Sequence, residues 1–478
     1  MTDDRLSVRS AARECPDRDA LVWEGATLSY RALADRVAAA CEALRGRSVT
    51  RGSRVAVRAQ NHPDAVVTLL ALMELDATAV LVHPRLTEVE ALALLDDAEP
   101  DLVLTSQGLQ ALASMPPGGA ERGASYDPDA ALAMLYTSGT TGRPKGAMLA
   151  RRAFVASADA SAANLRWRDD DRWLLCLPVC HIGGFSVLTR CVMARRCVVL
   201  LPRFDADAVL SAITRERATI LSVVPTMLGA LLDADGEGAL SRLRAVLVGG
   251  AATSTALRAR CASRRVRALA TYGLTEACSQ VTTQRLPPDG APFAVLEGSG
   301  PPLAGVEVSL RDEAGHEVTV GAVGRVFVRG ASVMTGYWRH PPLAGAWLDT
   351  GDLGSFDAER SLHLHARRTD LIVTGGENVY PAEVEHALLE IDGISSAMVF
   401  GVPDEAWGQV VAAAIVRART IDDERAWRSA VKAALAARLA SHKRPRRVCV
   451  VDALPLRATG KVDRAEGVRA FTPRLQPW

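Results

Sequence analysis

The sequence predicts an α/β fold with mostly parallel sheets, followed by a small antiparallel subdomain and a compact α+β unit. Through about the first 290 residues, short β-branched runs alternate with helical stretches rich in Ala, Leu and Arg. From about Gly298, strand-like segments follow one another, separated by Gly, Asp and Pro turns. The 478 residues also exceed the roughly 250–300 at which one hydrophobic core stops growing. We therefore expect at least two domains.

The individual elements follow from these runs. In the first region we expect strands at residues 54–57, 79–82, 102–104, 172–177, 197–201, 218–223 and 243–248. In the antiparallel, barrel-like part we expect strands at residues 306–310, 324–328 and 362–364. The last unit begins near Asp370 and contains a helix that starts at Pro381, with Glu383 and Glu385 in its first turn. A surface loop is expected at residues 116–125.

The charge balance points to no macromolecular partner. The 56 Lys and Arg residues are balanced by 55 Asp and Glu residues, which leaves a formal net charge of +1. The protein as a whole therefore has no electric field that would attract nucleic acid. The most apolar stretch, residues 65–82, contains Glu74 and Asp76, which a membrane-spanning helix would not accept. The acidic amino terminus lacks the features of a secretory signal. We expect a cytoplasmic protein that binds anionic ligands through local groups.

The cysteines predict neither disulfides nor a metal centre. There are nine, from Cys15 to Cys449, and no two form a CxxC pair. Cys176, Cys180 and His181 lie close in the sequence, but the surrounding LLCLPVCH indicates a buried strand and its exit. A zinc site is therefore not expected there.

A phosphate-binding loop is the strongest motif. Residues 135–148 are LYTSGTTGRPKGAM, in which the candidate ligand-binding residues are Thr137, Ser138, Gly139, Thr140, Thr141 and Lys145. Glycines allow close approach of the backbone to a phosphate, hydroxyls and amides donate to its oxygens, and lysine adds charge. It is not a Walker A loop, because Gly146 follows the lysine in place of Ser or Thr.

This loop resembles the signature of the adenylate-forming superfamily, which includes acyl-CoA synthetases, luciferase-like enzymes and peptide-synthetase adenylation domains. Further motifs follow in the family's order over nearly the whole chain. The resemblance implies a large domain at residues 1–368 with two mostly parallel sheets and a small barrel-like subdomain, then a mobile domain at residues 369–478. It also implies use of ATP, Mg²⁺ and coenzyme A to form an acyl-adenylate and then a thioester.

The resemblance assigns roles around the nucleotide. Residues 270–280, ATYGLTEACSQ, match a motif in which Tyr272 stacks on adenine, Thr275 donates to the α-phosphate and Glu276 holds magnesium. Thr141 is the second expected metal ligand. Gly249, Gly250 and Ala251, within LVGGAATS, match the loop on the other face of adenine.

Three further motifs complete the expected site. Asp352, in WLDTGDLGSFD, would accept from both ribose hydroxyls, and Arg367 would also reach the ribose. Lys461, in LPLRATGKVDR, would neutralise charge between the substrate carboxylate and the α-phosphate. Gly375 and Gly376 would line the channel for the pantetheine arm of CoA.

The same resemblance bears on two less regular segments. Thr369–Asp370 would form the pivot between the domains, although Ala366 and Thr369 depart from the family's Gly-Arg-x-Asp-Asp pattern. The basic run at residues 442–447 is either a solvated face or a contact for CoA phosphates.

The acid is indicated by residues 178–186, PVCHIGGFS, which resemble the family segment that carries an aromatic or histidine residue at the acyl pocket; that residue is His181 here. In amino-acid adenylation domains of this superfamily the corresponding region carries an aspartate that binds the substrate ammonium group. No aspartate lies between Leu177 and Thr189, so the resemblance disfavours an amino-acid substrate. Residues 171–188, 222–228, 272–280 and 370–385 resemble the o-succinylbenzoate:CoA ligases of menaquinone synthesis. Such an acid keeps a second carboxylate, for which the candidate donors are His181, Ser279, Gln280 and amides near Gly249. The pair Gly183–Gly184 predicts extra space at the pocket mouth.

Other functions stay open at this point. The chain could act on another aryl or medium-chain acid, or bind acyl groups or nucleotides without turnover; a light-emitting oxidation is a rarer variant. Intact Glu276, Asp352, Arg367 and Lys461 argue against a silent protein. The expected partners are small molecules, with no nucleic acid and no membrane span, and a homodimer is one open oligomeric state.

Overall fold

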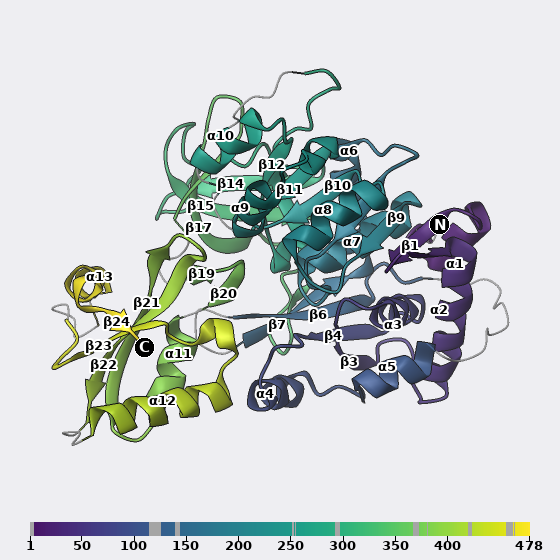
Figure 1. Cartoon of the computed structure of the whole chain (residues 1–478). Coiled ribbons are helices and arrows are strands. Elements are labelled where there is room, and N and C mark those ends of the chain that lie inside the picture. The colour runs from purple at the N-terminus through teal and green to yellow at the C-terminus, as the bar shows by residue number, and fades with distance from the viewer. Residues whose placement is uncertain are drawn as a thin grey trace. The chain divides into compact units, whose positions relative to one another are not determined.

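The protein's structure, a computed structural model, describes residues 4–113, 126–138, 144–250, 253, 255–291, 297–366, 372–379, 381–418, 423–455, 462 and 464–478. It divides into two compact units (Figure 1). The first comprises residues 1–84, 98–136 and 146–366, and the second comprises residues 85–97, 137–145 and 367–478.

An eight-stranded sheet forms one part of the first unit, and its strand order is β13-β12-β11-β10-β8-β9-β1-β2. The strands are β13 (Ser279–Thr283), β12 (Ala268–Leu274), β11 (Ala245–Val248), β10 (Ile220–Val223), β8 (Arg172–Leu175), β9 (Cys197–Leu200), β1 (Asp19–Trp23) and β2 (Ala26–Ser29). Its helices are α6 (Arg151–Leu165), α7 (Ile182–Ala194), α8 (Ala206–Arg215), α9 (Pro225–Ala234) and α10 (Thr255–Ser263), with 3₁₀ turns η1 (Ala239–Arg242) and η2 (Thr275–Ala277). The pairs from β12 to β1 are parallel, and β2 and β13 close the edges antiparallel.

A six-stranded sheet has the order β16-β7-β6-β4-β3-β5. Its strands are β16 (Gly336–Tyr337), β7 (Pro144–Ala150), β6 (Ala131–Ser138), β4 (Thr78–Val82), β3 (Arg54–Arg58) and β5 (Leu102–Leu104). The accompanying helices are α1 (Val8–Glu14), α2 (Tyr30–Arg45), α3 (Pro63–Glu74) and α5 (Ser106–Ala113), of which α2, α3 and α5 gather beside the sheet (Figure 1). The residues 65–82 that are most apolar thus form most of α3 and all of β4.

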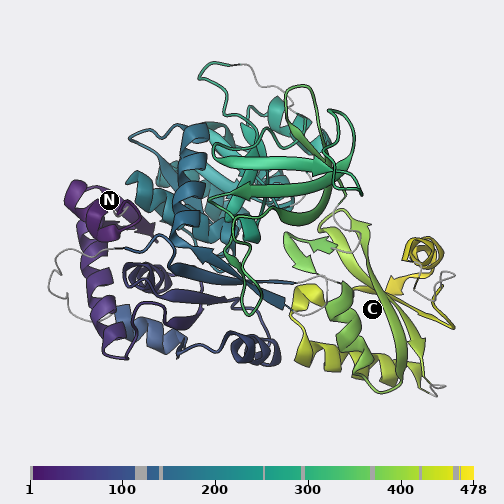
Figure 2. The ribbon, with the colours of Figure 1, turned by 180° about the vertical axis from the view of Figure 1, so that it is seen from behind.

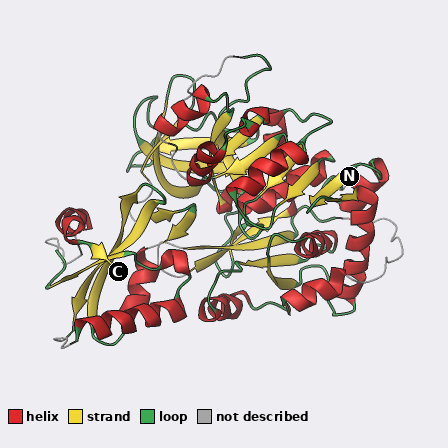
Figure 3. Cartoon of the chain, in the orientation of Figure 1, coloured by secondary structure: helices red, strands yellow, loops and turns green. Residues whose placement is uncertain are grey.

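Burial on both faces explains the continuous apolar runs of the parallel strands. In β8, Trp173 and Leu175 join the core shared with α6 and α7, whereas Leu174 joins the core beneath α8 and α9. Successive strand side chains point to opposite faces, so both faces must be apolar. Figure 3 shows helices (red) beside the strands (yellow) of these sheets.

A four-stranded antiparallel sheet completes the first unit, in the order β14-β15-β17-β18. Its strands are β14 (Val306–Arg311), β15 (Gly324–Gly330), β17 (Leu348–Phe356) and β18 (Leu362–Ala366). The view from behind shows these strands as a curved layer (Figure 2). This is the barrel-like subdomain expected from the Gly- and Asp-rich turns.

The second unit contains a sheet in the order β20-β19-β22-β23-β24, and β21 pairs with β22. Its strands are β20 (Glu377–Val379), β19 (Ile372–Thr374), β22 (Gly408–Arg417), β23 (Arg447–Val451), β24 (Gln476–Pro477) and β21 (Ile394–Asp404). Its helices are α4 (Glu88–Ala98, of which residues 88–97 belong to this unit), α11 (Pro381–Leu389), α12 (Glu424–Arg438) and α13 (Arg464–Phe471), with 3₁₀ turns η3 (Ser441–Lys443) and η4 (Thr472–Arg474).

The predicted fold class is confirmed: parallel sheets with helices, a curved antiparallel sheet and a small α+β unit are all present. Each expected strand exists, with bounds that differ by at most two residues at each end. Among the described residues, no helix is long and apolar enough to cross a membrane. The loop expected at residues 116–125 lies outside the described residues.

Candidate active site

The carboxyl ends of the parallel strands bring the predicted residues of the first unit to one edge. His181 follows β8, Gly249 and Gly250 follow β11, and Tyr272 and Glu276 lie at the end of β12. Because parallel strands run in one direction, their carboxyl ends lie along the same edge of the sheet, where ligands of open α/β sheets bind.

A tyrosine–aspartate pair joins this edge to the antiparallel sheet. The hydroxyl of Tyr272 donates to Oδ2 of Asp352 at 2.6 Å, and both residues are buried. The backbone amide of Asp352 donates to the Thr350 hydroxyl, which in turn donates to the carbonyl of Val326. These contacts orient the Asp352 carboxylate. The two residues predicted for adenine and ribose are therefore in direct contact.

The turn after β12 presents Glu276. Oε1 of this residue accepts from the Tyr337 hydroxyl at 2.8 Å, and its backbone carbonyl accepts from the amide of Met334. A carboxylate oxygen held in this way suits magnesium, a hard cation that prefers oxygen ligands. The second expected ligand, Thr141, lies outside the described residues.

The β12–β13 hairpin is tight. A Cβ at Gly273 would lie 1.8 Å from the Ser279 carbonyl oxygen, so only glycine fits. Cys278 and Ser279 both have positive φ, +53° and +90°, which is unusual for residues with side chains. Such strain persists where surrounding structure holds it, often at functional sites. Here it sets the position of Ser279, a predicted acyl-pocket residue.

The glycine pair after β11 packs against β12. Gly250 has φ +79°, and a Cβ at Gly249 would lie 2.9 Å from Cγ2 of Thr271, the neighbour of Tyr272. The absence of side chains lets this loop lie close to the predicted adenine residue.

His181 lies immediately before α7 and is exposed. The segment before it is held by the buried side chain of Asn61, whose amide donates to the carbonyls of Leu177 and Leu201 at 3.0 Å and whose oxygen accepts from the Val179 amide at 2.9 Å. Asn61 follows β3, so it ties this segment to the six-stranded sheet.

One expectation about the acyl pocket needs correction. A Cβ at Gly184 would lie 2.2 Å from the Pro178 carbonyl oxygen, so this glycine serves packing of α7 rather than space at a pocket mouth. The amide nitrogen of buried Gln280 donates to the Thr283 hydroxyl and so supports the hairpin, while its Oε1 has no hydrogen-bond partner among the described residues; its place at the acyl pocket stays a prediction.

A buried arginine was missed by sequence reasoning. Arg190 in α7 is 3% exposed, and within the described part of the chain its guanidinium contacts the Ser157 hydroxyl at 3.2 Å and lies over the Trp173 ring at 5.8 Å. Burial lowers its pKa to about 10. The available signal was one arginine inside the apolar stretch at residues 185–194.

Arg190 lies close to the strained hairpin. Ser157, its hydrogen-bond partner, donates to the Cys278 carbonyl at 2.7 Å, and Ser186, one helical turn before Arg190, lies 3.4 Å from the Ser279 hydroxyl. A buried cation costs free energy unless a counter-charge is supplied. The arrangement is therefore suited to a bound anion.

In the second unit, Gly375 and Gly376 form the turn between β19 and β20, with φ of +57° and +83°. A Cβ at Gly375 would lie 2.6 Å from the Trp407 ring. The Gly375 amide also donates a hydrogen bond to the backbone carbonyl of Trp407. Thr137 is the next-to-last residue of β6 and Lys145 is the second residue of β7, and both belong to this unit. Several predicted site residues lie outside the described part of the chain: the side chain of Ser138, and Gly139, Thr140, Thr141, Ala251, Arg367, Thr369, Asp370 and Lys461.

The basic run at residues 442–447 is not a plain solvated face. Lys443 is largely buried within the second unit and is paired with Glu383 at 2.7 Å and Glu90 at 3.2 Å. Burial opposes its charge, but the two carboxylates together raise its pKa. Arg446 stacks on the Trp407 ring at 4.0 Å. These two cations have protein partners and are not simply available to phosphates.

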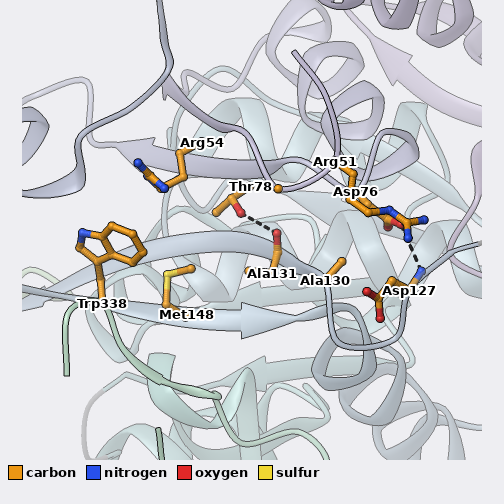
Figure 4. Close-up of a pocket in the computed structure, with 10 residues that line it drawn as sticks. Arg51, Arg54, Asp76, Thr78, Asp127, Ala130, Ala131, Met148 and Trp338 are labelled. Carbon is orange, nitrogen blue, oxygen red and sulfur yellow. Dashed lines mark hydrogen bonds and ion pairs between the residues drawn. The ribbon is translucent and has the colours of Figure 1, made fainter. Parts of the chain in front are cut away.

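A separate hollow lies at the edge of the six-stranded sheet where the strands β3, β4 and β6 begin. Its volume is about 250 Å³, and it is lined by Arg51, Gly52, Arg54, Asp76, Thr78, Asp127, Ala130, Ala131, Met148 and Trp338 (Figure 4). Arg54, Thr78 and Ala131 are at the amino ends of β3, β4 and β6. Its polar groups bond one another, as in Thr78 to the Ala131 carbonyl (Figure 4). The hollow is therefore apart from the candidate active site.

Comparison with known proteins gives a consistent result. Residues 8–338 match the model of the AMP-binding enzymes, and residues 383–461 match that of the AMP-binding enzyme C-terminal domain. The chain is 35% identical to a 2-succinylbenzoate–CoA ligase of Bacillus mycoides over 94% of this chain and 95% of that protein. A corresponding ligase of Bacillus cereus is 36% identical over the same shares.

Solved structures agree. An o-succinylbenzoate CoA synthetase from Bacillus subtilis, bound with a product analogue, superposes with a TM-score of 0.88 at 32% identity, covering 96% of this chain and 97% of that one. The same enzyme has been solved with ATP and magnesium, with a TM-score of 0.71 at 32% identity and coverage of 96% and 98%. An amide bond synthetase from Marinactinospora thermotolerans scores 0.85 at 31% identity, covering 97% and 99%.

Proposed function

Since the chain belongs to the AMP-binding enzyme family, we propose that it is an ATP-dependent acid–CoA ligase that acts on 2-succinylbenzoate. In the first half-reaction, an oxygen of the aliphatic carboxylate attacks the α-phosphorus of ATP and pyrophosphate leaves. In the second, the CoA thiol loses its proton, sulfur attacks the acyl carbon, and AMP leaves. The enzyme works in the cytoplasm, where ATP and CoA are available.

The observation that carries this proposal is the contact between Tyr272 and Asp352 beside Glu276. Asp352 accepts hydrogen bonds from the ribose hydroxyls, while the Tyr272 hydroxyl keeps its carboxylate oriented. Glu276, held by Tyr337, provides an oxygen ligand for magnesium. When bound, magnesium neutralises charge on the phosphate oxygens. Thr275 donates to the α-phosphate.

The remaining roles are part of the proposal. Gly249, Gly250 and Ala251 line the adenine site, and Arg367 binds the ribose. Thr137, Ser138, Gly139, Thr140, Thr141 and Lys145 hold the phosphates of ATP. Lys461 stabilises the charge that develops as the carboxylate attacks. Gly375 and Gly376 line the pantetheine channel during thioester formation.

The second carboxylate of the substrate selects the acid. It enters the acyl pocket ionised, and burying it without a partner costs several kcal/mol. Arg190 supplies the counter-charge: it is buried, and its described contacts include no carboxylate. His181 and Ser279 provide hydrogen-bond donors nearer the pocket mouth. An acid without a second carboxylate would leave this cation uncompensated.

A panel of acids tests the function. Pyrophosphate release and thioester formation are measured with 2-succinylbenzoate, benzoate and octanoate. We expect kcat/KM for 2-succinylbenzoate to exceed the other two by at least about a hundredfold, roughly 2.7 kcal/mol, the scale of an unpaired buried polar contact. Arg190→Met should reduce this preference by at least tenfold. Equal activity on acids lacking the second carboxylate would reject the substrate assignment while keeping the ligase.

The acceptor is tested separately, because one solved neighbour is an amide bond synthetase. Pre-formed acyl-adenylate is mixed with CoA or with a simple primary amine at equal concentration. We expect rapid thioester formation and only slow background amide formation. Enzyme-dependent amide formation without thioester would reject CoA as the acceptor.

A further inference from the structure

Three side chains of the types that bind metal ions lie close together beside the predicted acyl pocket. His83, Cys180 and His181 each offer one potential ligand atom, and these three atoms lie within 4.8 Å of one another. The centroids of the two imidazole rings are 5.0 Å apart. The set differs from the one suggested by sequence proximity, because His83 takes the place of Cys176. His83 is nearly a hundred positions away in the chain, so only the fold reveals this cluster.

The cluster is held by structure on both sides. His83 follows the carboxyl end of β4 in the six-stranded sheet, and Cys180 and His181 lie between β8 and α7. Asn61 fixes the segment before Cys180 through two hydrogen bonds, one to the Leu177 carbonyl and one from the Val179 amide. The carboxyl edges of two sheets therefore present the three side chains to one point.

The burial of the three residues suits a ligand that enters from solvent. Cys180 is 5% exposed, His83 is half-buried and His181 is exposed. The ion would sit against the buried thiolate and leave one coordination position toward solvent. Sites with three protein ligands and one open position are common for zinc.

The donor chemistry selects the ion. Two imidazoles and one thiolate are borderline and soft donors, which favour zinc over magnesium. Zinc–nitrogen distances of about 2.0 Å and zinc–sulfur distances of about 2.3 Å require the donor atoms to approach by about 1 Å. Rotation of the exposed His181 side chain supplies this movement. The Cys180 thiol releases its proton to solvent on binding, and no electron is transferred.

We propose that His83, Cys180 and His181 form a zinc site, separate from the magnesium ligand Glu276, and that zinc bound there reversibly inhibits the enzyme. Inhibition follows because zinc fixes His181 away from the acyl group. This second part rests on the proposed function, whereas zinc binding does not.

Metal titration tests the site without turnover. Tag-free protein, treated with chelator and kept in excess magnesium, is titrated with zinc by calorimetry and with cobalt(II) by absorption. We expect one equivalent, with a thiolate-to-cobalt band in the near ultraviolet. Cys180→Ala and His83→Ala should each weaken zinc binding at least about tenfold, and Cys180→Ala should abolish the band.

Cys176→Ala is the matched control, because Cys176 is a buried cysteine of the same segment outside the cluster. It should bind zinc like the unaltered protein. Thermal denaturation of each variant verifies folding, and a folded Cys180→Ala or His83→Ala protein that binds zinc normally would overturn the site. So would the absence of stoichiometric binding to the unaltered protein.

Activity measurements test the second part. Zinc should inhibit adenylate formation by the unaltered enzyme and by Cys176→Ala, and excess chelator should restore it. For Cys180→Ala, the zinc concentration that half-inhibits adenylate formation should be at least tenfold higher than for the unaltered enzyme. Zinc bound at this site with adenylation unchanged would overturn inhibition. An inactive protein that still binds zinc through these residues would reject the proposed function and keep the site.

Discussion

At the scale of single residues, one hydrogen bond joins the predicted adenine and ribose positions. Tyr272 comes from the parallel sheet and Asp352 from the antiparallel one, and the bond between them is 2.6 Å long and buried. Hydrogen bonds to a charged group contribute about 1.5–3 kcal/mol. The Tyr272 hydroxyl is therefore expected to matter for nucleotide binding beyond any stacking by its ring.

Tyr272→Phe should raise KM for ATP about tenfold, because the Asp352 carboxylate loses one of its orienting donors. Initial rates at varied ATP measure the effect. Tyr30→Phe is the matched control: that hydroxyl is also buried and donates to the carbonyls of Cys191 and Arg196. It should lower stability without changing KM for ATP. An unchanged KM in Tyr272→Phe would contradict the proposed role.

Lys461→Ala should lower adenylate formation by several orders of magnitude while leaving thioester formation from supplied acyl-adenylate nearly intact. In the proposed mechanism, the lysine stabilises charge only while the carboxylate attacks the phosphate. The two half-reactions are measured separately by pyrophosphate release and by thioester absorbance. An equal loss in both would assign Lys461 a structural role.

At the scale of elements, α7 is positioned by the absence of a side chain. Its second and third residues are glycines with different surroundings: Gly184 packs on the Pro178 carbonyl, whereas Gly183 has its nearest neighbour, Cδ1 of Leu177, at 3.5 Å from a built Cβ. The close contact between α7 and the loop before it therefore depends on Gly184 and not on Gly183.

Gly184→Ala should lower the free energy of unfolding by about 1–3 kcal/mol, because the loop before His181 must move. Gly183→Ala is the matched control and should be neutral or stabilise by up to about 1 kcal/mol. Urea denaturation of both proteins measures this. Equal stability of the two variants would show that the loop adapts at no cost.

At the scale of the whole molecule, the predicted site residues are divided between two units. Tyr272, Glu276 and Asp352 belong to the first, and Lys145, Gly375 and Gly376 to the second. The proposed use of Lys461 in one half-reaction and of the Gly375–Gly376 turn in the other would require rotation about a pivot, which we propose at Thr369–Asp370.

Thr369→Pro or Asp370→Pro should therefore impair thioester formation more than adenylate formation, because proline restricts φ at the pivot. Single-turnover rates of the two half-reactions measure the difference. Thr319→Pro, at a turn of the antiparallel subdomain, serves as a control for a general effect of proline. Unchanged rates for both half-reactions would place the pivot elsewhere.

The sequence by itself determined the fold class, the order of the strands along the chain and most of the nucleotide motifs, because hydrophobic periodicity and glycine-rich motifs are local properties. It did not reveal Arg190, the function of Gly184 in packing, or the approach of His83 to Cys180 and His181. Arg190 and the histidine–cysteine cluster depend on which distant segments meet, and the packing of Gly184 depends on how the chain turns back between Pro178 and α7. Only the tertiary structure decides that, because burial and donor geometry arise when strands far apart in sequence share one edge.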